Sequence, residues 1–179
     1  MSINRITAFF AAVLALAAAF PAAVPAQTEI VTVNWEISKM QGKNRTAYAP
    51  VTELRAAPEL KFSDYLRALV TLRNPSARTV EGLVLRYALR LRLNRQGDAP
   101  EKAFWGVPFY VEEVRVSKIN PGAERQAKVL NFELSEQLRK LRNTGFLPEA
   151  LKLEVMICPR QGDEPASIVR EAVIDIRKP

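Results

Sequence analysis

The most regular pattern of apolar and polar residues in the chain lies between residues 81 and 95. From Leu83 to Leu93 every second residue is leucine or tyrosine, and the residues between them are Val84, Arg86, Ala88, Arg90 and Arg92. Side chains on a β-strand point alternately to opposite faces of the sheet. The pattern therefore predicts a long strand with one face in the core and an arginine-bearing face in water.

Several other segments combine alternation with β-branched or aromatic residues and are bounded by turn residues, which predicts further strands. These strands are expected over residues 29–38, 65–73, 103–106, 109–119, 124–132, 151–158 and 168–176. Polar residues predict loops over 39–49 and 159–165. Pro50 and Pro58 limit 51–57 to a short edge segment at most.

One segment, residues 135–143, has the pattern of a helix. Ser135 is a suitable N-cap, Leu138 and Leu141 lie three positions apart, and basic residues crowd the last turn. Gly145 follows as a stop signal. We expect one short helix here.

About seven strands, one short helix and no alternation of strands with helices predict an all-β fold. The expected architecture is an antiparallel β-sandwich of immunoglobulin-like or fibronectin-like topology, and a small closed barrel is the alternative. Residues 117–122, Ser-Lys-Ile-Asn-Pro-Gly, resemble the Ile-x-Pro-Gly turn that often precedes a strand in bacterial secreted immunoglobulin-like modules. This resemblance implies the type of fold and no function.

Residues 1–26 are expected to be a cleaved signal peptide rather than part of the fold. Arg5 gives a charged start, residues 9–20 form an apolar run, and residues 24–26 offer small side chains at a cleavage site. The run is shorter than the roughly 20 apolar residues that cross a bilayer, so an uncleaved anchor and a buried helix are lesser alternatives. Residues 27–179 are then expected to form a single domain, periplasmic or extracellular, with no transmembrane segment.

The chain contains 26 lysines and arginines against 19 aspartates and glutamates, a net charge of +7 at pH 7. Of these charged residues only Arg5 lies in the predicted leader, so its removal leaves 25 against 19, or +6. A basic balance favours acidic partners such as lipid headgroups, polysaccharide or acidic proteins. The single cysteine, Cys158, excludes an intramolecular disulfide, and its strand context predicts a buried, inert thiol.

Five side chains are candidates for binding: Arg86, Arg90, Arg92, Trp105 and Tyr110. Three guanidinium groups on one strand face can bind carboxylates or sulfates, and aromatic rings can stack on a sugar or contact a protein. The structural alternative is that the arginines pair with glutamates on neighbouring strands, while the aromatic rings pack in the core. Both interpretations stay open on sequence alone.

Missing motifs argue against an enzyme. The sequence has no histidine, and it lacks a glycine-rich phosphate loop, a cysteine or histidine metal spacing and a Gly-x-Ser-x-Gly turn. No catalytic residue, metal site or cofactor is therefore predicted.

We expect an exported, non-enzymatic module of the bacterial cell envelope that binds a protein partner or self-associates through a strand edge or the arginine face. One alternative is a carbohydrate- or polyanion-binding domain that uses Trp105 and the arginines. Another is a periplasmic chaperone for secreted subunits, which holds a client's terminal carboxylate with a basic residue. Nucleic acid is not an expected partner, because export places the chain away from it.

Overall fold

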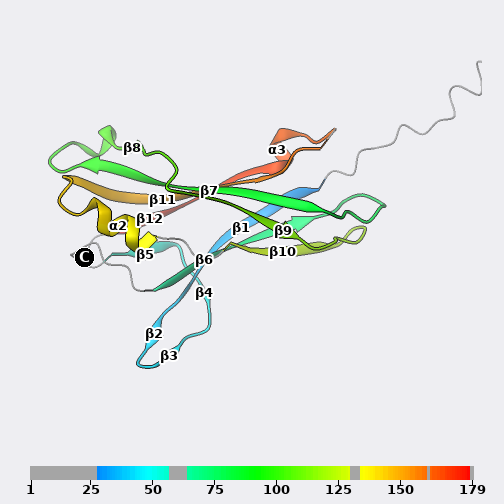
Figure 1. Cartoon of the computed structure of the whole chain (residues 1–179), viewed down its shortest axis with the longest axis horizontal. Helices are drawn as coiled ribbons and strands as arrows, with labels where there is room; N and C mark the ends of the chain where they lie inside the picture. Colours follow the sequence, from blue (N-terminus) through cyan, green and yellow to red (C-terminus); the bar gives the residue numbers. More distant parts are fainter. Residues whose placement is uncertain (1–27, 57–63, 130–133, 161, 178–179) are drawn as a thin grey trace, which may run out of the picture.

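The computed structural model describes residues 28–56, 64–129, 134–160 and 162–177, and most of its strands form two packed sheets (Figure 1). The four-stranded sheet has the order β10 (Glu124–Val129), β6 (Tyr65–Arg73), β1 (Glu29–Ser38) and β4 (Ala49–Pro50). The six-stranded sheet has the order β5 (Glu53–Arg55), β12 (Val169–Arg177), β11 (Phe146–Ile157), β7 (Leu83–Arg95) and β8 (Phe104–Trp105), and β9 (Tyr110–Val116) also pairs with β7. The predicted all-β sandwich is confirmed.

β7 lies inside the six-stranded sheet, with β11 on one side and β8 and β9 on the other. Leu85, Tyr87 and Leu89 are buried in the core, whereas Arg86 on the alternate face is exposed. The opposing layer comes chiefly from β6, whose alternate side chains are also buried: Leu66, Ala68, Val70 and Leu72. The alternation predicted for β7 is therefore confirmed, and its leucine face packs against the second sheet.

β11 is longer than the sequence predicts, because it begins at Phe146, before the alternating run of leucines. Gly145 has a φ of 75°, which lets the chain turn back at once so that Phe146 pairs with Arg95 of β7. The register shifts between Pro148 and Ala150, and this bulge accommodates a proline that cannot donate a hydrogen bond to the ladder. β7 and β11 therefore pair along most of their lengths.

Three details of the structure differ from what the sequence predicts. The segment 39–49 is more than a loop, because β2 (Met40–Gln41) and β3 (Asn44–Arg45) pair as a short hairpin. β5 pairs with β12 in parallel, so the six-stranded sheet is not wholly antiparallel. A short helix, α3 (Pro165–Ile168), precedes β12 where only a turn and a strand were expected, because proline is well suited to the first position of a helix.

The predicted helix is present with shifted ends. α2 (Leu134–Leu141) begins one residue before Ser135, which lies in the first turn and is therefore not the N-cap. The helix stops before Asn143, whose φ of 62° is incompatible with a right-handed helix. A 3-10 helix, η1 (Pro100–Lys102), precedes β8.

The predicted signal peptide and the end of the predicted strand at 130–132 lie outside the described residues. In the described part of the chain, no helix is both long and apolar enough to cross a membrane, and no three acidic or cysteine side chains gather as a metal site requires. Cys158 is half-buried rather than fully buried.

Asn74 ties the turn after β6 to the segment that follows β9. Its side chain is fully buried, and its Nδ2 donates to the carbonyl oxygens of Arg78 at 2.7 Å and Ile119 at 3.0 Å. Its Oδ1 accepts hydrogen bonds from the backbone N–H and the hydroxyl of Ser76. One buried amide therefore satisfies polar groups from two separate parts of the chain.

Replacing Asn74 with alanine is expected to lower the free energy of unfolding by roughly 2 to 3 kcal/mol, because buried carbonyl groups lose their donor. Urea denaturation followed by circular dichroism measures this change. Gln126 is the matched control, because its amide is exposed on β10, and Gln126→Ala should change stability by less than about 0.5 kcal/mol. Equal effects of the two substitutions would show that Asn74 does not have this role.

Candidate functional site

The three arginines predicted to bind a ligand lie on the outer face of β7, and each one already faces a carboxylate of a neighbouring strand. The nitrogen–oxygen distances are 2.5 Å for Arg86 and Glu113, 3.0 Å for Arg90 and Glu154, and 3.8 Å for Arg92 and Glu149. The first glutamate belongs to β9, and the other two belong to β11. The cross-strand pairing that the structural alternative expects is thus present on both sides of β7.

Lys152 extends these pairs into a network on the same face. Its Nζ lies 2.7 Å from Glu154 Oε1 and 3.2 Å from Glu171 Oε1, and its side chain is only 12% exposed. Four basic groups on this face are therefore matched by four carboxylates. Because neutralised charge attracts a polyanion only weakly, the face is a poor polyanion site. Ligand binding by the three arginines stays a prediction.

The two aromatic candidates lie on opposite faces of the six-stranded sheet. Trp105 pairs with β7 at the arginine row, and the Nζ of Lys152 lies 4.9 Å from its ring centroid. Tyr110 pairs with Leu89 on the core side, and its ring centroid lies 6.1 Å from that of Tyr87. Both tyrosine hydroxyls donate to Glu112, and burial is the main reason that the pKa of Tyr87 is raised. The structure therefore brings Trp105 to the arginines but not Tyr110.

Glu154 is the centre of the charge network. Burial alone would raise the pKa of its carboxyl, but hydrogen bonds from Lys152 and Arg90 outweigh burial, and the pKa lies below its usual value. The hydrogen bond to Glu154 likewise raises the pKa of Lys152 against the effect of burial. A carboxyl with a lowered pKa stabilises the fold above its unfolded-state pKa, and this contribution is lost as the pH falls through the folded-state pKa.

Glu154→Gln is expected to lower the free energy of unfolding near neutral pH by about 1 kcal/mol, because Lys152 and Arg90 lose a charged acceptor. The difference from the wild type should shrink as the pH falls, since the wild-type carboxyl then becomes protonated as well. Chemical denaturation at about pH 7 and about pH 3 measures both effects.

Glu113→Gln is the matched control, because it removes a carboxylate from a pair that is half exposed on both sides. Its effect near neutral pH should stay below about 0.5 kcal/mol. A destabilisation by Glu154→Gln that is equally large in acid would contradict the pKa account of the network.

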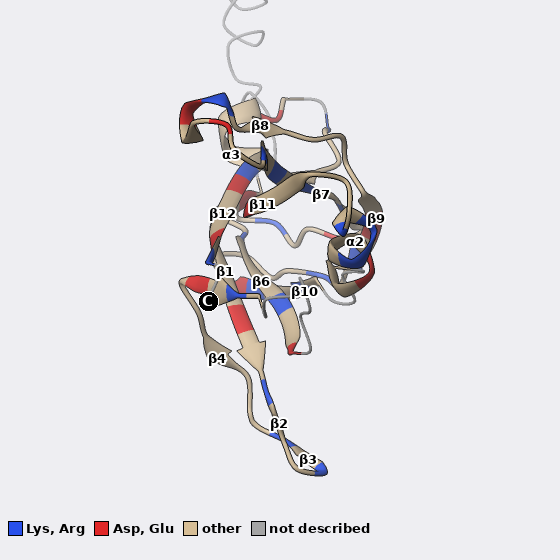
Figure 2. Ribbon diagram, turned by 90° about the vertical axis from the view of Figure 1, so that its left-hand side faces the viewer, with Lys and Arg blue, Asp and Glu red and all other residues tan. Residues whose placement is uncertain are grey.

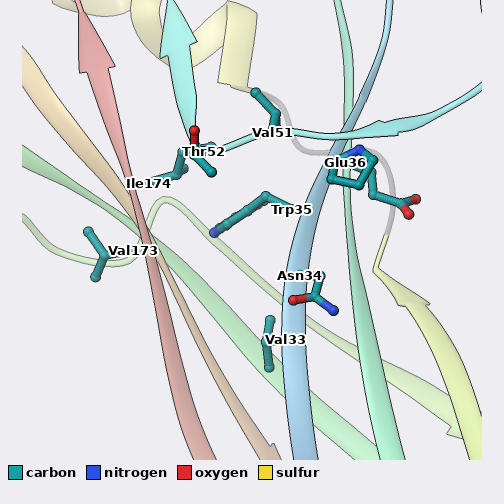
Figure 3. A pocket seen from close by; sticks show the side chains of 9 residues that line it. Val33, Asn34, Trp35, Glu36, Val51, Thr52, Val173 and Ile174 are labelled. Atoms are coloured by element: carbon teal, nitrogen blue, oxygen red, sulfur yellow. The ribbon is translucent and has the colours of Figure 1, made fainter.

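A pocket that the sequence does not indicate lies at one side of the sandwich, between β1 and β12 (Figure 3). Trp35 extends from β1 toward β12, and its buried indole forms part of the pocket (Figure 3). The volume is about 540 Å³, and the lining combines apolar and polar residues: Val33, Asn34, Trp35, Glu36, Pro50, Val51, Thr52, Val173 and Ile174.

The chain between β4 and β5 bounds one end of this pocket. β4 pairs with β1 and β5 pairs with β12, so Val51 and Thr52 cross from one sheet to the other. The N–H of Val51 donates to the carbonyl oxygen of Trp35 at 3.0 Å. Toward the other end, the Nε of Arg170 donates to the carbonyl oxygen of Ile30 at 3.1 Å and holds β12 beside β1. In Figure 3 the two strands diverge toward Trp35, where the pocket opens.

The parts of β1 and β12 that border the pocket have open edges. β4 pairs with β1 only at Glu36 and Ile37, and β5 pairs with β12 only over residues 175–177. Within the described ranges, no strand pairs with the outer side of residues 32–34 or 169–174. Three valines are exposed along these segments: Val31 (36%), Val169 (41%) and Val173 (51%).

Charge distinguishes the open edge of β1 from the two edges on the other side of the sandwich, whereas β12 itself carries the exposed Arg170 and Glu171. Residues 31–34 of β1, which we call the β1 edge, read Val-Thr-Val-Asn and carry no charge. By contrast, the outer strands β9 and β10 carry rows of exposed charged residues: Glu112, Glu113, Arg115, Glu124, Arg125 and Lys128. Charged edge strands discourage pairing with another chain. The β1 edge lacks this protection.

The pocket could not be predicted from the sequence, because the pocket depends on which strands lie next to each other in the fold. Trp35 alternates with polar residues in a predicted strand, and the structure buries it. Nothing in β1 shows that the distant β12 approaches it and then diverges. The sequence signal that could have indicated the pocket was the short, proline-flanked segment after Pro50. A segment this short pairs with little of β1, and the two-residue β4 does leave most of the β1 edge uncovered.

Comparisons with known proteins do not identify a family. No protein-family model matches the sequence, and no curated protein matches it significantly. Among solved structures, the crystal structure of the C-terminal domain of wzt is similar, with 12% sequence identity and a TM-score of 0.41 over 86% of this chain and 75% of that chain. A likeness at this level carries no argument about function.

Proposed function

We propose that this chain is an exported, non-enzymatic protein-binding module of the bacterial cell envelope. An extended segment of a partner protein lies along the β1 edge and places an apolar side chain in the pocket beside Trp35. The observation that carries this proposal is a pocket beside Trp35 that is bordered by an open, uncharged strand edge. The leader-like composition of residues 1–26 supports export.

The β1 edge can offer main-chain groups to an incoming strand. The carbonyl of Trp35 accepts a hydrogen bond from Val51 on the side away from β6. Residues two positions apart in a strand direct their backbone groups to the same side, so the N–H and C=O of Val33 face this side as well. Main-chain hydrogen bonds to an added strand supply affinity, and a neighbouring pocket selects its side chains.

The pocket is suited to an apolar anchor. Its volume of about 540 Å³ lies within the range of roughly 300 to 1,000 Å³ that is typical of ligand sites. Trp35 provides a rigid aromatic surface, and buried aromatic residues contribute much of the binding energy of protein interfaces. These properties favour an aliphatic or aromatic side chain of the partner over a charged ligand.

The arginine face is the weaker candidate surface. A ligand carboxylate or sulfate would have to displace the glutamates that already pair with Arg86, Arg90 and Arg92. The Nζ of Lys152 lies over the ring of Trp105, where a sugar would otherwise stack. The pocket side of the sandwich therefore supports a binding function better.

Photo-cross-linking from single positions tests the proposed function. A photoreactive phenylalanine analogue at Val33 is expected to form a covalent adduct with one envelope protein, because Val33 lies on the β1 edge and lines the pocket. Val173→Asp should reduce this adduct by about tenfold, since it places a charge at an apolar rim. Gel electrophoresis of labelled envelope extracts measures the adduct.

The exposed Val111 provides the matched controls, because it lies on the charged edge strand β9 and is 60% exposed. The photoreactive residue at Val111 should form no such adduct, and Val111→Asp should leave the Val33 adduct unchanged. Equal labelling from Val33 and Val111, or no adduct from Val33, would contradict the proposed function.

A further inference from the structure

The β2–β3 hairpin, residues 39–45, projects from the body of the sandwich (Figures 1 and 2). Every one of its residues is exposed. It carries Lys39, Lys43 and Arg45, and the sequence has no acidic residue between Ile37 and Thr52. This basic hairpin therefore presents positive charge at the end of a protrusion and contributes no side chain to the core.

The basic hairpin is nevertheless held in a defined shape. Thr46 clamps its base, because its hydroxyl accepts from the N–H of Lys39 at 2.9 Å and its carbonyl accepts from the Ser38 hydroxyl at 2.7 Å. The guanidinium of Arg45 lies 3.1 Å from the ring centroid of Tyr65 on β6. A two-residue ladder is only marginally stable in water, so these contacts are needed to order it. A preorganised charged protrusion lowers the entropy cost of binding.

The carboxylates that flank the basic hairpin in sequence are already neutralised. Glu36 pairs with Arg67 at 2.5 Å. Glu53, on the other flank, pairs with Arg55 at 3.0 Å and with Arg177 at 2.8 Å. These glutamates therefore do little to cancel the charge of the hairpin.

We infer that the basic hairpin is a docking element for an acidic segment of the partner protein. β1 and β4 run from the pocket directly into the hairpin, so a partner that occupies the pocket would meet it next. The inference rests on the proposed function, because it takes the partner to be the protein whose apolar anchor occupies the pocket. The hairpin steers the acidic segment electrostatically, while the pocket holds the apolar anchor.

An acidic protein segment fits the basic hairpin better than a membrane does. Its tip consists of Gln41, Gly42, Lys43 and Asn44, and Met40 is the single exposed apolar side chain among residues 39–45. Membrane attachment through basic residues alone needs clusters of roughly four to eight of them, more than the hairpin has. A projecting hairpin with three cations instead matches a local group of carboxylates on another chain.

Fluorescence anisotropy with fluorescein-labelled octaglutamate tests this inference on the intact chain. The triple variant Lys39→Gln, Lys43→Gln and Arg45→Gln is expected to weaken peptide binding at least about tenfold at low salt. The control triple variant Lys118→Gln, Arg125→Gln and Lys128→Gln removes the same charge from the opposite side and should weaken binding less than about threefold. Raising the salt from about 50 to about 300 mM should abolish the difference.

Equal weakening by the two triple variants would overturn the inference, because net charge alone would then explain binding. Stronger hairpin-dependent binding to vesicles with about 30% phosphatidylglycerol than to octaglutamate would also overturn it, in favour of a membrane. Octaglutamate has no apolar side chain to place in the pocket, so its binding reports on the basic hairpin alone. A failure of the pocket in the cross-linking experiment is therefore distinguishable from a failure of the hairpin.

Discussion

The alternation of leucine and arginine along β7 constrains the rest of the structure. A slip of one residue against β11 would move the arginines into the core and the leucines into water. The observed register places Leu89 opposite Leu153 and Arg90 opposite Lys152. With that register, the glutamates of β9 and β11 also reach the arginines of the outer face. One alignment of strands therefore satisfies both the burial of apolar groups and the pairing of charges.

A β-sandwich buries the inner faces of its sheets but leaves the edge strands open. In this chain the edge strands on the two sides of the sandwich differ. β9 and β10 carry charged side chains, which protect their backbone groups from pairing with another chain. On the other side, β4 and β5 cover only the ends of β1 and β12, and the pocket that Trp35 helps to line lies in the gap that remains. The difference between the charged strands β9 and β10 and the uncharged β1 edge is the physical basis of the proposed binding function.

The faces of the strands could be predicted from the sequence, whereas the neighbours of the strands could not. β1 and β6 have the predicted bounds, because alternation is a local property of the chain. The parallel pairing of β5 with β12 depends on contacts between distant segments, which no local pattern shows. The same holds for Tyr110, because its register against Leu89 places it on the core side, away from the arginines.

Amide hydrogen exchange measured by NMR tests most directly whether the β1 edge is open. The amide of Leu89 should exchange slowly, because β7 lies between paired strands on both sides. The amide of Val33 should exchange much faster, because no described strand pairs with that side of β1. Protection of Val33 as strong as that of Leu89 would show that the edge is closed and would contradict the account.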